Sequence, residues 1–291
     1  KTKFLPFNKG IENPEVENDY RVEYMWNEVF TPDNLSDIIS NFVFVSEEEE
    51  LEYNNKTEKV EKKTQESLIF PRYHQLDLIK NFKNQIPVDD IGTNYLVQHT
   101  TGSGKSYSIG WLAHLLTSLY KDKDSDERMF SSIIVVTDRK VLDKQLQNTI
   151  TSLQQVKGVV NNVEQGSKQL KEFLEQGKDI IVTTIQKFPY VISNINELDQ
   201  KSFAVIIDEV HSSQSGELAT AMKSALNIDI SENEDEIDLE EMLNRQINVK
   251  GKQSHISYFG FTGTPKEATL EVFGTKNQSG GFEPFHTYSM K

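Results

Sequence analysis

Five short, continuous runs of apolar residues place the strongest constraint on the fold. They occupy residues 95–99, 131–137, 179–184, 203–208 and 257–262. None of them alternates polar with apolar residues in the way that a strand with one solvated face does. Each run therefore predicts a β-strand that is covered on both faces, which is the usual environment of strands in a parallel sheet.

Amphipathic stretches separate these runs. Apolar residues recur at helical spacing after residue 105 and again after residue 138, so each stretch carries one apolar stripe. The alternation of buried strands with such helices predicts a doubly wound α/β domain over residues 67–291. The two stripes are Leu112, Leu115, Leu116 and Leu119, and Leu142, Leu146, Ile150 and Leu153.

Composition narrows the class of protein. Of the 291 residues, 36% are hydrophobic and 26% are charged, which fits a soluble globular protein. The apolar runs are far too short to cross a bilayer, so we expect no membrane partner. The chain has no cysteine, which excludes disulfides, thiolate zinc sites and cysteine nucleophiles, and its six histidines show no metal-ligand spacing. The lack of cysteine also suits a cytoplasmic location.

A net charge of −14 argues at first against nucleic acid as a partner. However, eight acidic side chains and no basic one fall within residues 229–241, and a second acidic stretch begins at residue 47. We interpret residues 229–241 as a solvated acidic insertion in the α/β domain. The overall charge therefore decides nothing about DNA binding.

Residues 1–66 precede the α/β pattern and are interpreted as a separate connector. Thr31 and Pro32 suit the N-cap and the first position of a short helix. Residues 46–66 are first acidic and then rich in lysine and glutamate, with few apolar anchors. We interpret them as an acidic linker that is either mobile or a solvent-exposed helix.

The sequence HTTGSGKS, residues 99–106, is a glycine-rich loop directly after the first apolar run. Such a loop between a parallel strand and a helix points N–H groups at an anion. Lys105 would reach the β- and γ-phosphates of ATP, and the Ser106 hydroxyl would bind Mg²⁺. The usual pattern has glycine where His99 stands, and an ordinary turn without a ligand is the alternative. The candidate nucleotide-binding residues here are Thr101, Gly102, Ser103, Gly104, Lys105 and Ser106.

The motif DEVH, residues 208–211, also follows an apolar run. Asp208 would help to hold Mg²⁺, and Glu209 would polarise the attacking water, because hydrolysis of a phosphoanhydride depends mainly on positioning. An acidic strand end with no ligand is the alternative. The order of the two motifs, with GSGKS first and DE second, favours the nucleotide site.

The motif GFTGTP, residues 260–265, ends the last of the five runs. Thr262 and Thr264 would link the γ-phosphate end of the site to domain motion through His211 and the region of Glu209. A Thr-Gly-Thr-Pro turn taken alone is ordinary loop chemistry.

In this order, GSGKS, DEVH and TGTP resemble motifs I, II and III of superfamily 2 helicases and translocases. The resemblance implies a RecA-like P-loop domain, with a central, mostly parallel sheet flanked by helices. It implies that Gln75, in the upstream stretch FPRYHQ, reads the adenine edge; a surface glutamine is the alternative. It also implies ATP and Mg²⁺ as cofactors. The implied catalytic residues are Lys105, Asp208, Glu209 and His211, and the implied metal ligands are Ser106 and Asp208.

Nearly the whole chain also resembles the R subunit of type I restriction-modification enzymes. The similarity runs from FLPFNKG through IVTTIQKF and DEVHSSQ to FHTYS, and Ser212 departs from it where a basic residue is frequent. The resemblance implies ATP-dependent translocation of double-stranded DNA. It also implies a fragment without the family's nuclease domain and second RecA-like domain. That second domain and the methyltransferase and specificity subunits are the implied partners.

The same resemblance implies contacts with the sugar-phosphate backbone of DNA, without base recognition. For Arg139 and Lys187, a solvated charge near a helix start is the alternative. A different superfamily 2 motor and a nucleotide-dependent regulatory module that does not move on DNA stay open, although the FLPFNKG block favours the restriction subunit. The candidate DNA-binding residues are Thr137, Arg139, Thr184, Gln186 and Lys187.

Overall fold

The computed structural model divides the chain into two compact units, residues 1–80 and 81–291. The sequence pattern placed the start of the motor domain at residue 67, within the first of these units, so our domain assignment stays a prediction. No helix among the described residues is long and apolar enough to span a membrane. The described residues are 17, 25–54, 59–89, 91–122, 124–137, 140–153, 158–164, 166–187, 191, 195, 198, 200–209, 255–277 and 279–289, without the side chains of 47–54, 59–63, 65, 140–145, 186 and 268.

The first unit contains short helices followed by a β-hairpin. A π-helix, η2 (Met25–Val29), precedes α1 (Pro32–Asn41), and helix α2 (Tyr73–Asp89) begins in this unit. Thr31 is the N-cap of α1 in an extended conformation, with proline following it, which confirms the predicted helix start. The Thr31 hydroxyl donates a hydrogen bond to the carbonyl oxygen of Glu28 and so ties α1 to η2.

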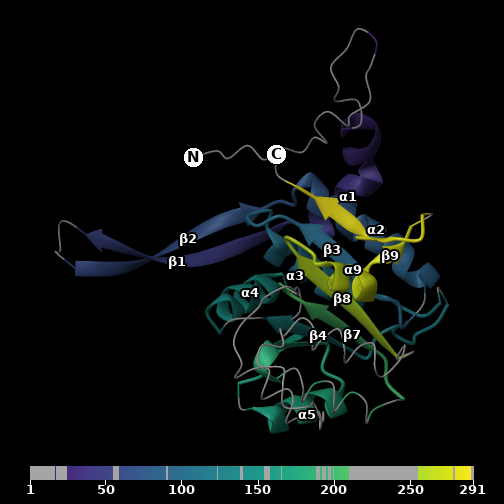
Figure 1. The fold of residues 1–291 in the computed structure, drawn as a ribbon. Helices are drawn as coiled ribbons and strands as arrows, with labels where there is room; N and C mark the ends of the chain where they lie inside the picture. Colours follow the sequence, from purple (N-terminus) through teal and green to yellow (C-terminus); the bar gives the residue numbers. More distant parts are fainter. Residues whose placement is uncertain are drawn as a thin grey trace. The chain divides into compact units, whose positions relative to one another are not determined.

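Strands β1 (Phe44–Asn54) and β2 (Lys59–Ile69) pair in antiparallel register along their whole length, as a long twisted ribbon (Figure 1). The described residues between 46 and 66 are therefore strands, so the interpretation of this stretch as an exposed helix is wrong, whereas its role as a linker stays a prediction. A two-stranded ribbon is held by the backbone hydrogen bonds between its strands, whose register runs from Phe44 opposite Ile69 to Asn54 opposite Lys59, and it needs no buried face. The sequence accordingly lacks the apolar alternation from which a strand would be predicted.

The second unit is built on a seven-stranded sheet in its described residues. Every strand pair is parallel, and the order is β11–β3–β8–β7–β4–β6–β5. This confirms the predicted α/β class with a central parallel sheet, and all five predicted strands. The sequence did not predict β5 or β11. The bounds are β3 Tyr95–His99, β4 Ser132–Thr137, β5 Val160–Asn162, β6 Ile180–Thr184, β7 Phe203–Ile207, β8 Ile256–Thr262 and β11 His286–Tyr288.

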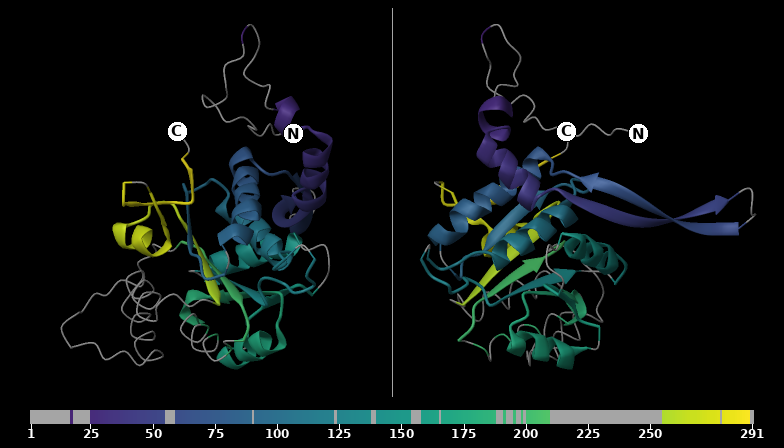
Figure 2. Two further views of the ribbon diagram at one scale, coloured as in Figure 1. Left: turned by 90° about the vertical axis from the view of Figure 1, so that its right-hand side faces the viewer. Right: turned by 180° about the vertical axis from the view of Figure 1, so that it is seen from behind.

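Helices cover both faces of this sheet (Figures 1 and 2). Helices α3 (Lys105–Thr117) and α4 (Lys140–Ser152) contact each other and the central strands. Helix α5 (Ser167–Gln176) lies on the opposite face. After β5 the next strand, β6, is placed back toward the centre of the sheet, and a right-handed crossover then puts the connecting helix on the other face. Helix α9 (Glu267–Phe273) contacts β3 and β8, and the short β9 (Thr275–Lys276) and β10 (Phe282–Glu283) form a hairpin after it.

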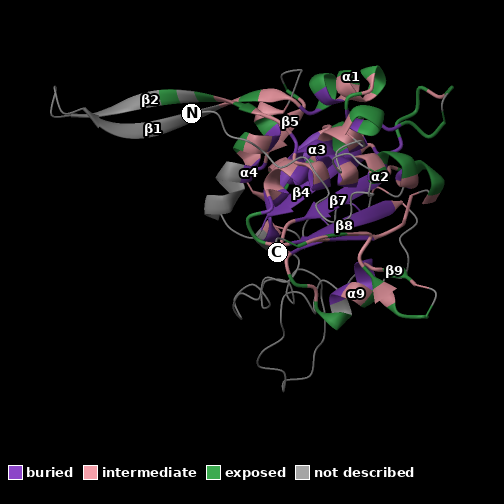
Figure 3. Cartoon of the chain, turned by 90° about the horizontal axis from the view of Figure 1, so that it is seen from above, coloured by how far each residue is buried: buried purple, intermediate pink, exposed green. Residues whose placement is uncertain are grey.

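The core lies on both sides of the central strands, and β4, β6, β7 and β8 are buried along their whole length (Figure 3). On one face, Leu170 and Leu174 of α5 join a cluster of strand side chains that also includes residues of α9. On the other face, Phe82 of α2 packs edge-on against Tyr95 and Phe259. Burial on two faces explains why the strand sequences are continuously apolar.

Candidate nucleotide site at the carboxyl edge of the sheet

The parallel order brings the ends of β3, β8 and β7 together at one edge of the sheet. Strand β3 pairs with β8, so that Gln98 lies opposite Thr262, and β8 pairs with β7, so that Gly260 lies opposite Ile207. The glycine-rich loop, the TGTP turn and the acid pair leave these three neighbouring strands. Ligand sites of open parallel sheets lie at this edge.

The glycine-rich loop begins with a tight turn. The backbone N–H of Ser103 donates to the carbonyl of Thr100, and Gly102, the third residue of that turn, has φ of 81°. A positive φ at this position is the mark of a type II turn and favours glycine. Gly104 is the N-cap of α3 with φ of 86°, so the helix starts at Lys105. The backbone that leads into α3 therefore favours glycine at both positions, 102 and 104.

Lys105 is buried at the start of α3, with 8% of its side chain exposed. Its ammonium lies 3.0 Å from Oε1 of Glu209 and donates a hydrogen bond of 3.2 Å to the carbonyl oxygen of His99. The structure thus brings the lysine of the first motif into contact with an acid of the second.

The acid pair follows β7 directly. The N–H of Asp208 donates to the carbonyl of Val136, which continues the pairing of β7 with β4 by one residue. Glu209 then has φ of 51°, the one positive φ of a non-glycine residue in the described part of the chain. Such a conformation costs on the order of 1 kcal/mol and tends to occur at functional sites. Here the turn places the Glu209 carboxylate beside Lys105.

The TGTP turn packs against the start of the glycine-rich loop. Thr262 is fully buried, and its hydroxyl accepts a hydrogen bond of 3.2 Å from the N–H of Thr264. A Cβ placed on Gly263 would lie 3.7 Å from the His99 carbonyl oxygen and from the Thr101 hydroxyl. The turn therefore lies close to the loop that carries Lys105, with room for little more than a Cβ between them, and Thr264 is exposed.

Gln75 belongs to the first unit and is buried in α2. Its side-chain oxygen accepts a hydrogen bond of 2.8 Å from the N–H of Arg72, which caps the start of the helix. Its proposed role toward adenine stays a prediction. His211, Arg139 and the acidic insertion 229–241 lie outside the described residues, as does the side chain of Gln186.

The described DNA-binding candidates lie at the ends of β4 and β6, the next two strands after β7 along the same edge. Thr137 ends β4 and lies opposite Thr184, which ends β6. Both threonines are largely buried, with 1% and 7% exposed. The Lys187 ammonium donates a hydrogen bond of 2.6 Å to the carbonyl of Val163 and is partly buried. The strand order thus separates these candidates from the glycine-rich loop.

A pair of histidines beside the loop was not predicted. Nε2 of His99 lies 2.8 Å from Nδ1 of His286, which belongs to β11. In the sequence, His99 is visible only as a departure from the loop pattern, and the residues around position 286 do not predict a strand. No group of histidine and acidic residues in the described part of the chain is arranged to hold a metal by itself.

Comparison with known proteins decides the family. The sequence profile described as SWI2/SNF2 ATPase matches residues 74–231, which is more than half of the chain. The chain belongs to the SWI2/SNF2 ATPase family. The matched residues of this SWI2/SNF2 ATPase include the glycine-rich loop and the acid pair. This confirms an ATPase-type, helicase-like enzyme domain.

The chain is also similar to endonuclease subunits of type I restriction enzymes, which confirms the resemblance found in the sequence. It is 26% identical over 241 residues to the SsaAORF53P subunit of Staphylococcus saprophyticus, with 78% of this chain and 21% of the relative covered. It is 30% identical over 191 residues to the HindI subunit of Haemophilus influenzae, covering 60% of this chain and 16% of the relative. The chain thus spans about a fifth of the length of such relatives.

Among solved structures, a nuclease-deletion mutant of the Type ISP restriction-modification enzyme LlaGI in complex with a DNA substrate mimic matches with a TM-score of 0.43. The sequence identity is 14%, and the match covers 68% of this chain and 18% of that chain.

Proposed function

We propose that this chain is the ATP-binding part of a motor that translocates double-stranded DNA, within the endonuclease subunit of a type I restriction enzyme. The contact of the Lys105 ammonium with the Glu209 carboxylate carries the proposal, because it joins the two motifs that an ATP site requires. The similarity to restriction subunits supports the finer assignment. A DNA-translocating enzyme of this kind would work in the cytoplasm.

The residues present fit Mg²⁺·ATP. The loop turns into α3 through two glycines with positive φ, so the first N–H groups of the helix and Lys105 lie at one place, as phosphate binding requires. The Lys105 cation would neutralise the β- and γ-phosphates. Ser106 and Asp208 would hold Mg²⁺, which when bound supplies charge neutralisation to the phosphates. Glu209 would orient the attacking water and accept its proton.

The strand order supports a separate DNA path. ATP candidates leave β3, β8 and β7, whereas Thr137, Thr184 and Lys187 leave β4 and β6 on the same edge. The loops after β3, β8 and β7 would therefore bind the nucleotide, and the residues that follow β4 and β6 would contact the DNA backbone. Contacts with sugar and phosphate alone would give tracking without sequence preference.

We do not expect these 291 residues by themselves to hydrolyse ATP at full rate. In our proposal a second RecA-like domain of the same subunit supplies arginine to the site, and such an arginine is worth about three to five orders of magnitude in related NTPases. Methyltransferase and specificity subunits would select the DNA. We expect the 291-residue chain to bind Mg²⁺·ATP weakly and to hydrolyse it slowly.

The test measures nucleotide binding and DNA-stimulated ATPase activity of Lys105→Ala. Lys121→Ala is the matched control, because Lys121 is an exposed lysine with its own ion pair to Glu127. We expect Lys105→Ala to lose binding of Mg²⁺·ATP and Lys121→Ala to keep it. In the full subunit we expect DNA to stimulate turnover. Loss of binding without any DNA stimulation of the wild-type subunit would instead favour the nucleotide-dependent regulatory module.

A further inference from the structure

Strand β11 lies beside the strand that leads into the glycine-rich loop. His286 pairs with Val97 and Tyr288 pairs with His99 in parallel register, and β11 is the outermost strand on this side of the sheet. The pairing starts before β11, because the N–H of Phe285 donates to the carbonyl of Leu96. A segment almost 190 residues away in sequence from His99 therefore borders the start of the loop.

One peptide unit joins β11 to the lysine of the loop. The carbonyl oxygen of His99 accepts the hydrogen bond from the Lys105 ammonium, at 3.2 Å. The N–H of Thr100, in the same planar unit, donates to the carbonyl of Tyr288, at 3.1 Å. Because the peptide unit is rigid, a rotation that disturbs one of these hydrogen bonds disturbs the other.

The side chain of His99 fixes the same unit from a second direction. Its Nε2 lies 2.8 Å from Nδ1 of His286, its ring meets that of His286 at 65°, and the Tyr288 ring lies 5.9 Å from it. One imidazole donates and the other accepts, since the two facing nitrogens share one hydrogen. His99 has no exposed surface, and a hydrogen bond of a buried polar group is costly to lose.

We propose that His286 is a positioning residue of the nucleotide site. It holds the His99 ring and, with the Tyr288 carbonyl, fixes the peptide unit whose oxygen orients Lys105. The inference rests on the proposed ATP site and adds a residue that none of the three motifs contains. It also gives a reason for a bulky, buried histidine at position 99, where the loop pattern has glycine.

The test compares three substitutions on β11. His286→Leu removes the hydrogen bond to His99. His286→Asn keeps a polar atom on Cγ, where Nδ1 of histidine is attached. Thr287→Ala is the matched control, because Thr287 is exposed and lies between the two residues that contact His99. Each variant of the 291-residue chain is titrated with Mg²⁺·ATP and with AMP, which lacks the phosphates that Lys105 would contact, and its thermal unfolding is recorded.

We expect His286→Leu to bind Mg²⁺·ATP roughly five-fold more weakly, the factor in an equilibrium constant that one net hydrogen bond represents, with AMP affinity unchanged. His286→Asn should stay within about two-fold of the wild type, and Thr287→Ala should equal it. Long-range ¹H–¹⁵N spectra of the wild type should show that the facing nitrogens of His99 and His286 differ in protonation.

Three results separate the outcomes. If the wild-type chain binds no Mg²⁺·ATP, the proposed ATP site itself is refuted. A wild-type chain that binds it while His286→Leu binds it equally well overturns the positioning role. Equal losses for ATP and AMP also overturn it, because they indicate general destabilisation. If His286→Leu does not fold, His286→Gln decides: it moves the polar atom one carbon outward, and an ATP affinity equal to that of His286→Asn refutes the proposal.

Discussion

The substitution Glu209→Gln should tighten ATP binding while it slows hydrolysis. In the structure the Glu209 carboxylate lies beside the cation that would contact the phosphates. Bound ATP would have to share Lys105 with this carboxylate, which would also repel the γ-phosphate. The amide keeps the shape and hydrogen-bonding capacity of the side chain but removes its charge, so the competition disappears.

The distance sets the size of the effect. Two unit charges 3.0 Å apart interact by about 5 kcal/mol at an effective dielectric constant of about 20, and desolvation offsets most of this. Exposed ion pairs contribute about 0.2–1 kcal/mol. The Lys105–Glu209 pair is less exposed, so we expect a net change of about 1–2 kcal/mol, which corresponds to roughly 5- to 30-fold tighter binding. Loss of water activation should lower the hydrolysis rate by at least about 100-fold.

Anisotropy of a fluorescent ATP analogue measures the affinity, and phosphate release measures the rate. Glu127→Gln is the control, because Glu127 is the acid of the exposed pair with Lys121 and should change neither quantity. An unchanged or weaker affinity of Glu209→Gln would show that this ion pair does not compete with nucleotide. Unchanged hydrolysis would remove Glu209 from the mechanism.

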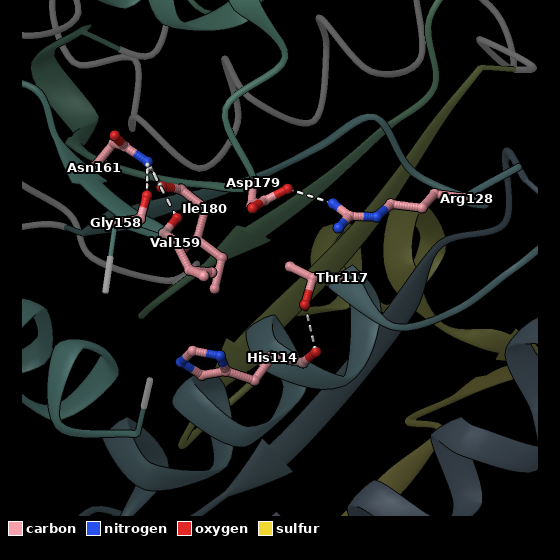
Figure 4. Close-up of polar contacts among 8 residues, drawn as sticks. All are labelled: His114, Thr117, Arg128, Gly158, Val159, Asn161, Asp179 and Ile180. Carbon is pink, nitrogen blue, oxygen red and sulfur yellow. Dashed lines mark hydrogen bonds and ion pairs between the residues drawn. The ribbon is translucent and has the colours of Figure 1, made fainter. Parts of the chain in front are cut away.

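Three further predictions concern the glycine-rich loop, a histidine of α3 and an ion pair beside the start of β6. Gly102→Ala should cost about 1 kcal/mol of stability, because its φ is 81°, and should weaken ATP binding; Gly280→Ala, with φ of 82°, should cost similar stability and leave ATP binding unchanged. Burial lowers the pKa of His114, whose Nε2 donates to the carbonyl of Ile150, so the unfolded chain binds more protons between the folded pKa and 6.5. The unfolding free energy should therefore fall as the pH drops below 6.5, and urea titrations of His114→Asn should show a smaller fall. Asp179→Asn removes the partly exposed ion pair with Arg128 (Figure 4) and should cost about 0.2–1 kcal/mol, less in about 0.5 M salt.

The central sheet could be predicted because burial is recorded locally in the sequence. Each of the five apolar runs is a strand covered by helices on two faces, and the observed β3, Tyr95–His99, has the predicted bounds. The motifs follow these strands, and parallel strands end at one edge. Proximity of the glycine-rich loop to the acid pair was therefore predictable without knowledge of the strand order.

The β1–β2 ribbon could not be predicted for the opposite reason. Among the described residues its strands pair with each other alone. Val45 and Leu68, which lie opposite each other, are exposed, and of its described apolar side chains only Phe44 and Ile69 at its base are partly buried. No face of the ribbon has to be apolar, so the glutamate and lysine runs carry no period of two. The same residues suit an exposed helix equally well, and only the cross-strand pairing distinguishes the two structures.

Strand β11 escaped prediction because its stability comes from its neighbour. HTY is three residues long, is only partly buried, and gains its hydrogen bonds by pairing with β3. What the sequence does show at this point is an apparent fault, a histidine where the loop pattern has glycine. A buried imidazole needs a polar partner, and the partner is supplied by His286. The departure at His99 and the unpredicted strand β11 are thus two halves of one contact, which places a single rigid peptide unit between β11 and the lysine of the candidate ATP site.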